Sequence, residues 1–280
     1  MKVMVTGVGG QLGYDVAERL GINGDEVLAP RHDELDITDK DSVRSYFTVN
    51  GPEALIHCAA YTAVDLAEDN EAECRKVNVE GTTFLVEQCR LLDIPIVYIS
   101  TDYVFNGTGD QPWKVDDPTS PINVYGLSKR DGEDVVRTYE KHFIVRISWV
   151  FGINGKNFIK TMLDFSKKID TVRVVADQYG SPTYTYDLAP LLCEMIRTHK
   201  YGTYHAHNEG VCTWYDIAVE TFRVARIQMN VIPITSDEYP MRAKRPHNSR
   251  LETVSLKNFG FNSLPNWKKS IAHYIGVIKL

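Results

Sequence analysis

Short apolar runs alternate with longer amphipathic stretches through the first 150 residues of this 280-residue chain. The run at 54–58 is almost continuously apolar, which is typical of a strand covered on both faces. Repeated strand–helix–strand units with short connections predict an α/β fold with a doubly wound parallel sheet. We predict strands at 2–6, 26–29, 54–58, 96–100 and 143–147, and helices at 11–20, 39–49 (with Thr38 as N-cap), 71–92 and 124–140.

The alternation loosens after about residue 150, where turn residues become more frequent and loops become longer. Residues 151–280 therefore predict a second, smaller domain, with some segments returning to pack on the sheet of residues 1–150. Helices are expected near 158–167, 186–198, 214–226 and 267–277.

Composition excludes several classes of protein. The net charge of −6 and the pI of about 5.8 argue against a nucleic-acid partner, which usually meets a basic domain. No apolar run approaches the roughly 18 residues of a membrane span, so no membrane association is expected. The five cysteines include no Cys-x-x-Cys pair, which favours a reducing cytoplasm and no metal site.

A glycine-rich turn follows the first predicted strand, in the stretch MVTGVGGQLGYDV. Its spacing is Gly7-x-x-Gly10-x-x-Gly13, because Leu12 stands where the commoner G-x-G-x-x-G pattern has its last glycine. Glycines allow the tight turn and the approach of a diphosphate to the backbone, and the following helix offers free N–H groups. An ordinary glycine turn is the alternative. The position between strand and helix favours a Rossmann-type dinucleotide-binding domain over residues 1–150.

The end of the second strand bears on the choice of cofactor. An acid there would hold the 2′-hydroxyl of NAD, whereas Arg31 suits the 2′-phosphate of NADP. Because of Arg31 we predict NADPH, and because the acid Asp33 lies close by, NADH stays open as the alternative. Two further segments follow predicted strands, at Asp36-Ile37 and from Ala59 to Thr62. Loops at these places would close over the adenine and a ribose of the cofactor. The alternative is that the alanines simply pack in the core.

A tyrosine and a lysine open the helix predicted at 124–140. Tyr125 and Lys129 are four residues apart and share one face of that helix. A nearby ammonium is expected to bring the pKa of a tyrosine toward neutrality, so that the phenol can protonate a carbonyl oxygen. Thr101 and Asp102 end the fourth strand, where open α/β sheets bind ligands. An exposed Tyr/Lys pair and ordinary turn chemistry are the competing interpretations.

The loop at 241–250 is basic in an acidic chain, with cations at Arg242, Lys244, Arg245 and Arg250. A nucleotide diphosphate is a matching partner. A solvated basic loop is the competing interpretation.

Seven motifs in order give the chain a family resemblance. They are GQLG (10–13), AAYTAVDLAE (59–68), STDYVFNGTG (100–109), PINVYGLSK (121–129), ISWVFG (147–152), DQYGSPT (177–183) and RPHNSRL (245–251). Together they resemble the dTDP-4-dehydrorhamnose reductase family, within the extended short-chain dehydrogenases/reductases. The resemblance implies that NADPH reduces the C4 ketone of dTDP-4-dehydro-β-L-rhamnose to give dTDP-L-rhamnose, for rhamnose-containing cell-surface polysaccharide.

The resemblance also implies roles for individual residues. Tyr125 is the proton donor and Lys129 its activator, with Thr101 and Asp102 completing the catalytic set. The cofactor is expected to contact Gly7, Gly10, Gln11, Leu12, Arg31, Asp36, Ile37, Ala59, Ala60, Tyr61, Thr62, Tyr125 and Lys129. The substrate is expected to contact Thr101, Asp102, Tyr103, Trp149, Arg245, Asn248 and Arg250.

Two features of the sequence separate the chain from some relatives. Certain members are dimers bridged by a metal through glutamates, whereas here Asp15 stands near one such position and Tyr186 near the other. We therefore predict a monomer or weak homodimer. Dehydratases carry an Asp-Glu pair after the threonine, but Tyr103 follows Asp102 here, which favours reduction over dehydration. Two alternatives stay open: the chain is an epimerase, or it is a regulatory subunit that binds a dinucleotide without catalysis.

Overall fold

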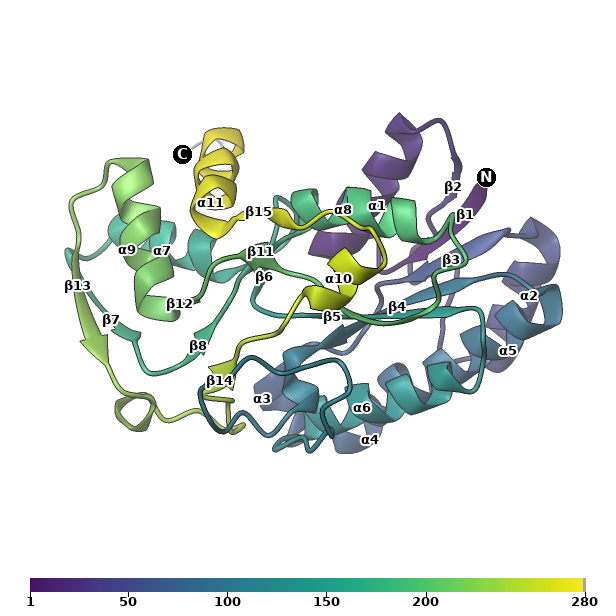
Figure 1. Cartoon of the computed structure of the whole chain (residues 1–280), viewed down its shortest axis with the longest axis horizontal. Helices are drawn as coiled ribbons and strands as arrows, with labels where there is room; N and C mark the ends of the chain where they lie inside the picture. Colours follow the sequence, from purple (N-terminus) through teal and green to yellow (C-terminus); the bar gives the residue numbers. More distant parts are fainter. Residues whose placement is uncertain (279–280) are drawn as a thin grey trace.

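The computed structural model describes residues 1–278. Its main sheet contains β1 (Lys2–Thr6), β2 (Glu26–Leu28), β3 (Ala54–His57), β4 (Ile96–Thr101), β5 (His142–Ile147) and β10 (Gly202–His205). The order is β10–β5–β4–β3–β1–β2, and every neighbouring pair is parallel (Figure 1). The predicted doubly wound sheet is therefore confirmed. After β2 the chain crosses β1 to form β3, so the order reverses between β1 and β3, and ligands bind at such a switch point.

Helices cover both faces of this sheet (Figure 1). On one face lie α1 (Gln11–Ile22) and α8 (Thr185–Met195), and on the other lie α2 (Lys40–Asn50), α5 (Thr82–Leu92) and α6 (Val124–Arg137). Alternate residues of β1 supply the two cores: Val3 and Val5 pack toward α1, and Met4 packs toward α2. Near-continuous apolar strands follow from this double coverage.

Two of the predicted helices differ from the structure. Asp39, and not Thr38, caps α2, because its carboxylate accepts hydrogen bonds from the backbone N–H groups of Asp41 and Ser42. The helix predicted at 71–92 is broken into α4 (Glu71–Arg75), a π-helical segment η1 (Lys76–Gly81) and α5. A π-turn adds a residue to the helix and is frequent near functional sites.

The second half of the chain builds a smaller layer beside the sheet. It contains α7 (Phe158–Ser166), α9 (Trp214–Ala225), α11 (Trp267–Val277) and the parallel pair β7 (Thr171–Val175) and β13 (Asn230–Ile234), which enclose separate apolar clusters. From this half, β10 pairs with β5 and α8 packs against α1. The short elements are β6 (Val150–Phe151), β8 (Tyr179–Gly180), β9 (Thr183–Tyr184), β11 (Asn208–Glu209), β12 (Cys212–Thr213), β14 (Asn248–Ser249), β15 (Leu264–Asn266), α3 (Val64–Ala67), α10 (Val254–Asn258), η2 (Asp102–Val104) and η3 (Ser236–Glu238).

Within residues 1–278, none of the helices has both the length and the apolar character needed to span a bilayer.

Candidate active site

The glycine turn lies at the switch point of the sheet, where the backbone leaves no room for side chains. Gly7 has a φ of +73°, and a Cβ there would lie 2.6 Å from the backbone nitrogen of Ala59. A Cβ on Gly13 would lie 2.3 Å from the carbonyl oxygen of Gly7, so the helix α1 packs directly on the turn. The amide of Gly10 donates to that same oxygen at 2.9 Å. The turn is therefore a bare backbone cradle of the kind that a diphosphate needs.

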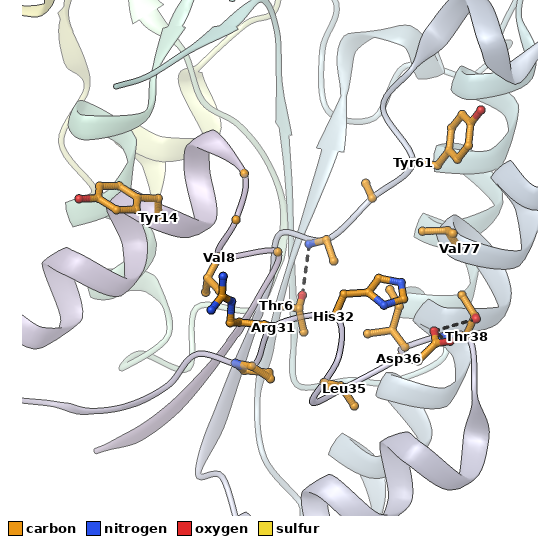
Figure 2. Close-up of a pocket in the computed structure, with 17 residues that line it drawn as sticks. Thr6, Val8, Tyr14, Arg31, His32, Leu35, Asp36, Thr38, Tyr61 and Val77 are labelled. Atoms are coloured by element: carbon orange, nitrogen blue, oxygen red, sulfur yellow. Dashed lines mark hydrogen bonds between the residues drawn. The ribbon is translucent and has the colours of Figure 1, made fainter. Parts of the chain in front are cut away.

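A cavity of about 810 Å³ extends from this cradle (Figure 2). Figure 2 shows Arg31 beside Val8 and His32 toward Asp36. The Asp36 carboxylate accepts hydrogen bonds from the amide and hydroxyl of Thr38 at 2.9 and 2.8 Å, which lowers its pKa and keeps it ionised. Of the residues predicted for the cofactor, the cavity is lined by Gly7, Gly10, Arg31, Asp36, Ile37, Ala59, Ala60 and Tyr61.

A second cavity, of about 520 Å³, adjoins the first and shares Gly7, Gly10, Ala59 and Ala60 with it. Its wall brings together the predicted catalytic side chains and the rest of the predicted cofactor contacts. Of the predicted residues, it adds Gln11, Leu12, Thr62, Thr101, Asp102, Tyr103, Tyr125, Lys129 and Trp149. The two cavities together offer one continuous lining from Arg31 to Tyr125.

The start of α6 is fixed by local contacts. Asn123 caps the helix, since its side chain accepts a 2.7 Å hydrogen bond from the amide of Gly126. A Cβ on Gly126 would lie 2.2 Å from the carbonyl oxygen of Tyr103, so the helix and the end of β4 pack without a gap. This contact brings the rings of Tyr103 and Tyr125 edge to face, with centroids 5.8 Å apart.

The pKa of Tyr125 differs from the expectation. Burial, together with the nearby Asp102 carboxylate, raises it above the usual tyrosine value, while the Thr101 hydroxyl acts in the opposite direction. The predicted shift toward neutrality is therefore wrong in this structure, because desolvation outweighs any help from Lys129. The phenol stays protonated at neutral pH, as a proton donor requires.

Lys129 is 3% exposed, and its ammonium lies 4.0 Å from the centroid of the Tyr98 ring. Burial lowers the pKa of Lys129 to about 7, and the Glu133 carboxylate one turn later acts in the opposite direction. Glu133 itself is held by Arg146 through a buried ion pair at 2.8 Å. The lysine is thus a desolvated amine that loses its proton near pH 7, and the Tyr98 ring and the Glu133 carboxylate favour its charged form.

Thr101 and Asp102 are bonded to each other at the end of β4. The Thr101 hydroxyl donates to Oδ1 of Asp102 at 3.0 Å and accepts from the amide of Tyr103 at 3.2 Å. Asp102 is 2% exposed, and burial raises its pKa to about 6. This carboxyl group therefore titrates close to neutral pH.

Trp149 lines the second cavity in an unusual backbone conformation, with a φ of +50°. Such a value is rare for a bulky residue and marks a position that the surroundings enforce. Its indole stacks on that of Trp214 at a centroid distance of 4.3 Å. Sequence reasoning missed Trp214, which sits at the start of a helix with nothing nearby to single it out.

The predicted substrate contacts of the basic loop are placed differently. Arg245 forms a bidentate pair with Asp65, at 2.7 and 3.1 Å, and lines a third cavity of about 420 Å³ together with Trp214. The Asn248 amide donates to the carbonyl oxygens of Thr108 and Gln111, and its oxygen accepts from Arg250. Asn248 and Arg250 line none of these three cavities, and their contact with the substrate stays a prediction.

Asn78 is a further residue that sequence reasoning missed. It lies in the π-turn η1, 1% exposed, and its side chain bonds both the amide and the carbonyl of Tyr61. The same amide donates to the hydroxyl of Ser128 at 2.9 Å, next to Lys129. Asn78 therefore ties the cofactor loop to the catalytic helix. The sequence predicted one unbroken helix over 71–92, so no local signal pointed to this residue.

Asp15 and Tyr186 stand near the positions at which some relatives bind a bridging metal. Asp15 is buried and accepts a hydrogen bond from the Thr185 hydroxyl, whereas Tyr186 is exposed and its ring stacks on His273. No cluster of three or more potential metal ligands is present within residues 1–278.

Comparison with known proteins identifies the family of the chain. The model of the RmlD substrate binding domain matches residues 1–279. A dTDP-4-dehydrorhamnose reductase of Aggregatibacter actinomycetemcomitans is 41% identical, over 96% of this chain and 97% of that protein. The crystal structure of such a reductase from Clostridium acetobutylicum superposes with a TM-score of 0.97 at 38% identity, covering 100% of both chains. That of the Bacillus anthracis enzyme, in complex with NADP, gives a TM-score of 0.95 at 38% identity and 98% coverage of both. Because the family model matches nearly the whole length of this chain, the chain belongs to the RmlD substrate binding domain family.

Proposed function

We propose that this protein uses NADPH to reduce the C4 ketone of dTDP-4-dehydro-β-L-rhamnose, giving dTDP-L-rhamnose for rhamnose-containing cell-surface polysaccharide. One observation carries the proposal: Tyr125, Thr101 and Lys129 line a single cavity that continues into the glycine cradle. The relatives named as dTDP-4-dehydrorhamnose reductases support the choice of substrate.

Residues 1–150 hold the cofactor in this proposal. The glycine turn receives the diphosphate at the N-terminus of α1, and Arg31 faces the 2′-phosphate. When bound, NADPH supplies hydride to the ketone carbon. Lys129 holds hydroxyl groups of the nicotinamide ribose. NADH stays possible as a weaker substitute, because Arg31 is the one side chain proposed to recognise the 2′-phosphate of NADPH.

The proton comes from the chain. Tyr125 donates its phenolic proton to the ketone oxygen as charge develops there, and the Thr101 hydroxyl orients the same oxygen. The raised pKa of Tyr125 keeps that proton in place until the oxygen becomes basic. In this proposal Lys129, one helical turn after Tyr125 on α6, stabilises the phenolate that results.

Residues 151–280 mainly bind the sugar nucleotide. The third cavity meets the catalytic one at Trp214, and its walls are apolar and aromatic, with Phe158, Met241 and Tyr239. Arg245 lies on its rim and can meet a diphosphate while Asp65 orients it. The sugar therefore lies between Tyr125 and the stacked tryptophans, and the nucleoside in the third cavity.

The decisive experiment is an NADPH-oxidation assay with purified protein and dTDP-4-keto-6-deoxyglucose, in the presence of a 3,5-epimerase that supplies the L-sugar. We expect one NADPH consumed per sugar and dTDP-L-rhamnose as the product in the NMR spectrum. Conversion of a sugar nucleotide without NADPH consumption would instead identify an epimerase or dehydratase. Tight NADPH binding with no turnover on any keto-sugar would identify a regulatory subunit.

We also propose a cytoplasmic location and a monomer or weak homodimer. The five cysteines are all free thiols, which suits a reducing compartment. Sedimentation at several protein concentrations, with and without Mg²⁺, tests the oligomeric state; a metal-dependent dimer would contradict it.

A further inference from the structure

Three polar side chains, two from consecutive residues and one from a distant strand, converge at the wall of the catalytic cavity. Thr101 ends β4, Asp102 begins η2, and Ser249 belongs to β14, which pairs with β8. A Cβ on Gly180 of β8 would lie 3.0 Å from the Cβ of Ser249 and 2.9 Å from the Trp149 ring, so Ser249 stands directly behind the cavity wall.

The hydrogen bonds at this place are incomplete. Oδ1 of Asp102 accepts from the Thr101 hydroxyl at 3.0 Å, but Oδ2 is buried and has no hydrogen-bond partner among the described residues. The Ser249 hydroxyl, 1% exposed, is likewise buried and unpartnered there. The Ser249 hydroxyl lies near enough to Asp102 to lower the pKa of that carboxyl group, but it does not form a well-aligned hydrogen bond with it. Unsatisfied buried polar atoms are costly and rare, and they often have a functional reason.

The Thr101 hydroxyl connects this pair to the proton donor. It donates to Asp102, and it lines the same cavity as the phenol of Tyr125. A hydroxyl can donate one hydrogen bond and accept others, so it can pass a proton between two neighbours. Tyr125, Thr101 and Asp102 thus stand together on one wall of the cavity, with Thr101 bonded to Asp102.

We propose that Asp102 is the proton reservoir of the reduction: through the Thr101 hydroxyl it returns the proton that Tyr125 gives to the substrate, while Ser249 positions its outer carboxyl oxygen. This inference rests on the proposed function and adds the route by which the tyrosine is recharged.

The transfer balances at each atom. NADPH, the reductant of the proposed function, provides the hydride and its two electrons to the carbon. The Tyr125 O–H bond breaks as an O–H bond forms on the substrate oxygen. For the relay the Asp102–Thr101 hydrogen bond reverses, so that the protonated carboxyl group donates to the Thr101 oxygen. The Thr101 hydroxyl then turns to the Tyr125 phenolate and gives it a proton, and the Asp102 carboxyl proton moves to the Thr101 oxygen. Asp102 is left as a carboxylate and takes a new proton from water before the next turnover.

The surroundings give Asp102 a suitable proton affinity. Burial raises its pKa to about 6, so a fraction is protonated near neutral pH. The titratable groups that face it are Tyr103 and Tyr125, whose pKa values burial raises far above neutrality, and Arg245 acts on Tyr103 from the basic loop. Lys129 is the other group in the cavity that titrates near pH 7, so the test must separate the two.

A pH titration of the free protein by infrared difference spectroscopy tests the reservoir without turnover. We expect a protonated-carboxyl band with a midpoint near pH 6 that is absent in Asp102→Asn. In Ser249→Ala the midpoint should rise by about half a unit or more, because an interaction that stabilises the carboxylate is lost. Ser255→Ala is the matched control, since its hydroxyl is also buried and unpartnered among the described residues but is not one of the groups that act on Asp102. A midpoint near pH 4 in the wild type would overturn the proposal.

The pH dependence of kcat provides the second measurement. We expect Asp102→Asn to lower kcat at least tenfold and to remove the alkaline limb that Asp102 causes, with KM for the sugar changed less than about threefold and NADPH affinity unchanged. Ser249→Ala should move that limb upward in parallel with the infrared midpoint, which a limb due to Lys129 would not do. An effect of Asp102→Asn on KM alone would reduce Asp102 to a substrate contact and refute the reservoir. If the wild type titrates as expected but consumes no NADPH, the proposed function fails while Asp102 is still shown to hold a proton.

Discussion

The indole rings of Trp149 and Trp214 stack at a centroid distance of 4.3 Å, with their planes inclined by 26°. Both rings line the second cavity, although the two residues are 65 positions apart in the sequence. The left-handed backbone of Trp149 is held by this contact and by the close approach of Gly180. An aromatic surface formed in this way suits the apolar face of a sugar ring.

Truncation of Trp214 tests that surface. Aromatic pairs contribute about 0.5–1.5 kcal/mol beyond their buried area, so Trp214→Ala should raise KM for the sugar nucleotide roughly three- to tenfold. Trp214→Phe keeps a ring for stacking and should have a smaller effect. Steady-state kinetics with a NADPH-binding titration separates the sugar from the cofactor. An unchanged KM in Trp214→Ala would exclude contact with the sugar nucleotide.

Tyr125→Phe removes the proposed proton donor and little else. General acid catalysis contributes about 10²–10⁴-fold, so kcat should fall by roughly that factor. NADPH affinity, measured by fluorescence, should be unchanged because the ring and the helix α6 stay in place. A variant with near wild-type turnover would show that another group supplies the proton.

Gly7→Ala should weaken NADPH binding at least about tenfold. The new Cβ would lie 2.6 Å from the Ala59 nitrogen, on a backbone whose φ of +73° side chains avoid. The matched control is Gly21→Ala in the helix α1, where nothing lies within 4 Å of the new Cβ. That change should leave NADPH affinity unchanged and raise stability by up to about 1 kcal/mol. Equal NADPH affinity in the two variants would exclude the turn as the diphosphate site.

Arg31→Ala tests the choice of cofactor. Hydrogen bonds to charged groups contribute about 1.5–3 kcal/mol, so KM for NADPH should rise at least about tenfold. KM for NADH should hardly change, because NADH lacks the 2′-phosphate. Arg44→Ala, an exposed arginine on α2 that does not line the cavity, is the control. Equal losses with both cofactors would contradict a role for Arg31 in selecting the phosphate.

Lys129→Met should abolish most activity yet stabilise the fold at neutral pH. Burial lowers the pKa of Lys129 to about 7, whereas the unfolded chain keeps an ordinary lysine. Between pH 7 and the ordinary lysine value the unfolded state therefore binds more protons, so wild-type stability rises with pH there. The penalty is complete below pH 7, where a pKa shift from 10.5 to about 7 corresponds to about 5 kcal/mol, and we expect the variant to be more stable by up to that amount. Urea unfolding at pH 7 and pH 9 measures the difference, which should shrink at pH 9; a constant difference would refute the assignment.

Several features of the fold followed from neighbours in the sequence. The strand predicted at 2–6 and the helix predicted near 267–277 have these bounds in the structure, and the strand predicted at 54–58 ends one residue earlier. Local patterns sufficed here because backbone preference and apolar periodicity depend on adjacent residues. The pair Tyr125 and Lys129 was also predictable, since a helix places residues four apart on one face.

The sequence by itself thus determined the doubly wound sheet, the cradle for a dinucleotide and the identity of the tyrosine, lysine and threonine that meet there. Only the tertiary structure decided their chemistry. The stacking of Trp214 on Trp149, the pairing of Arg245 with Asp65 and the placing of Ser249 behind Asp102 each join segments far apart in the chain. The pKa values near 6 for Asp102 and near 7 for Lys129 arise from loss of water around each group. Desolvation depends on every atom that folding packs nearby, and no local pattern of residues encodes it.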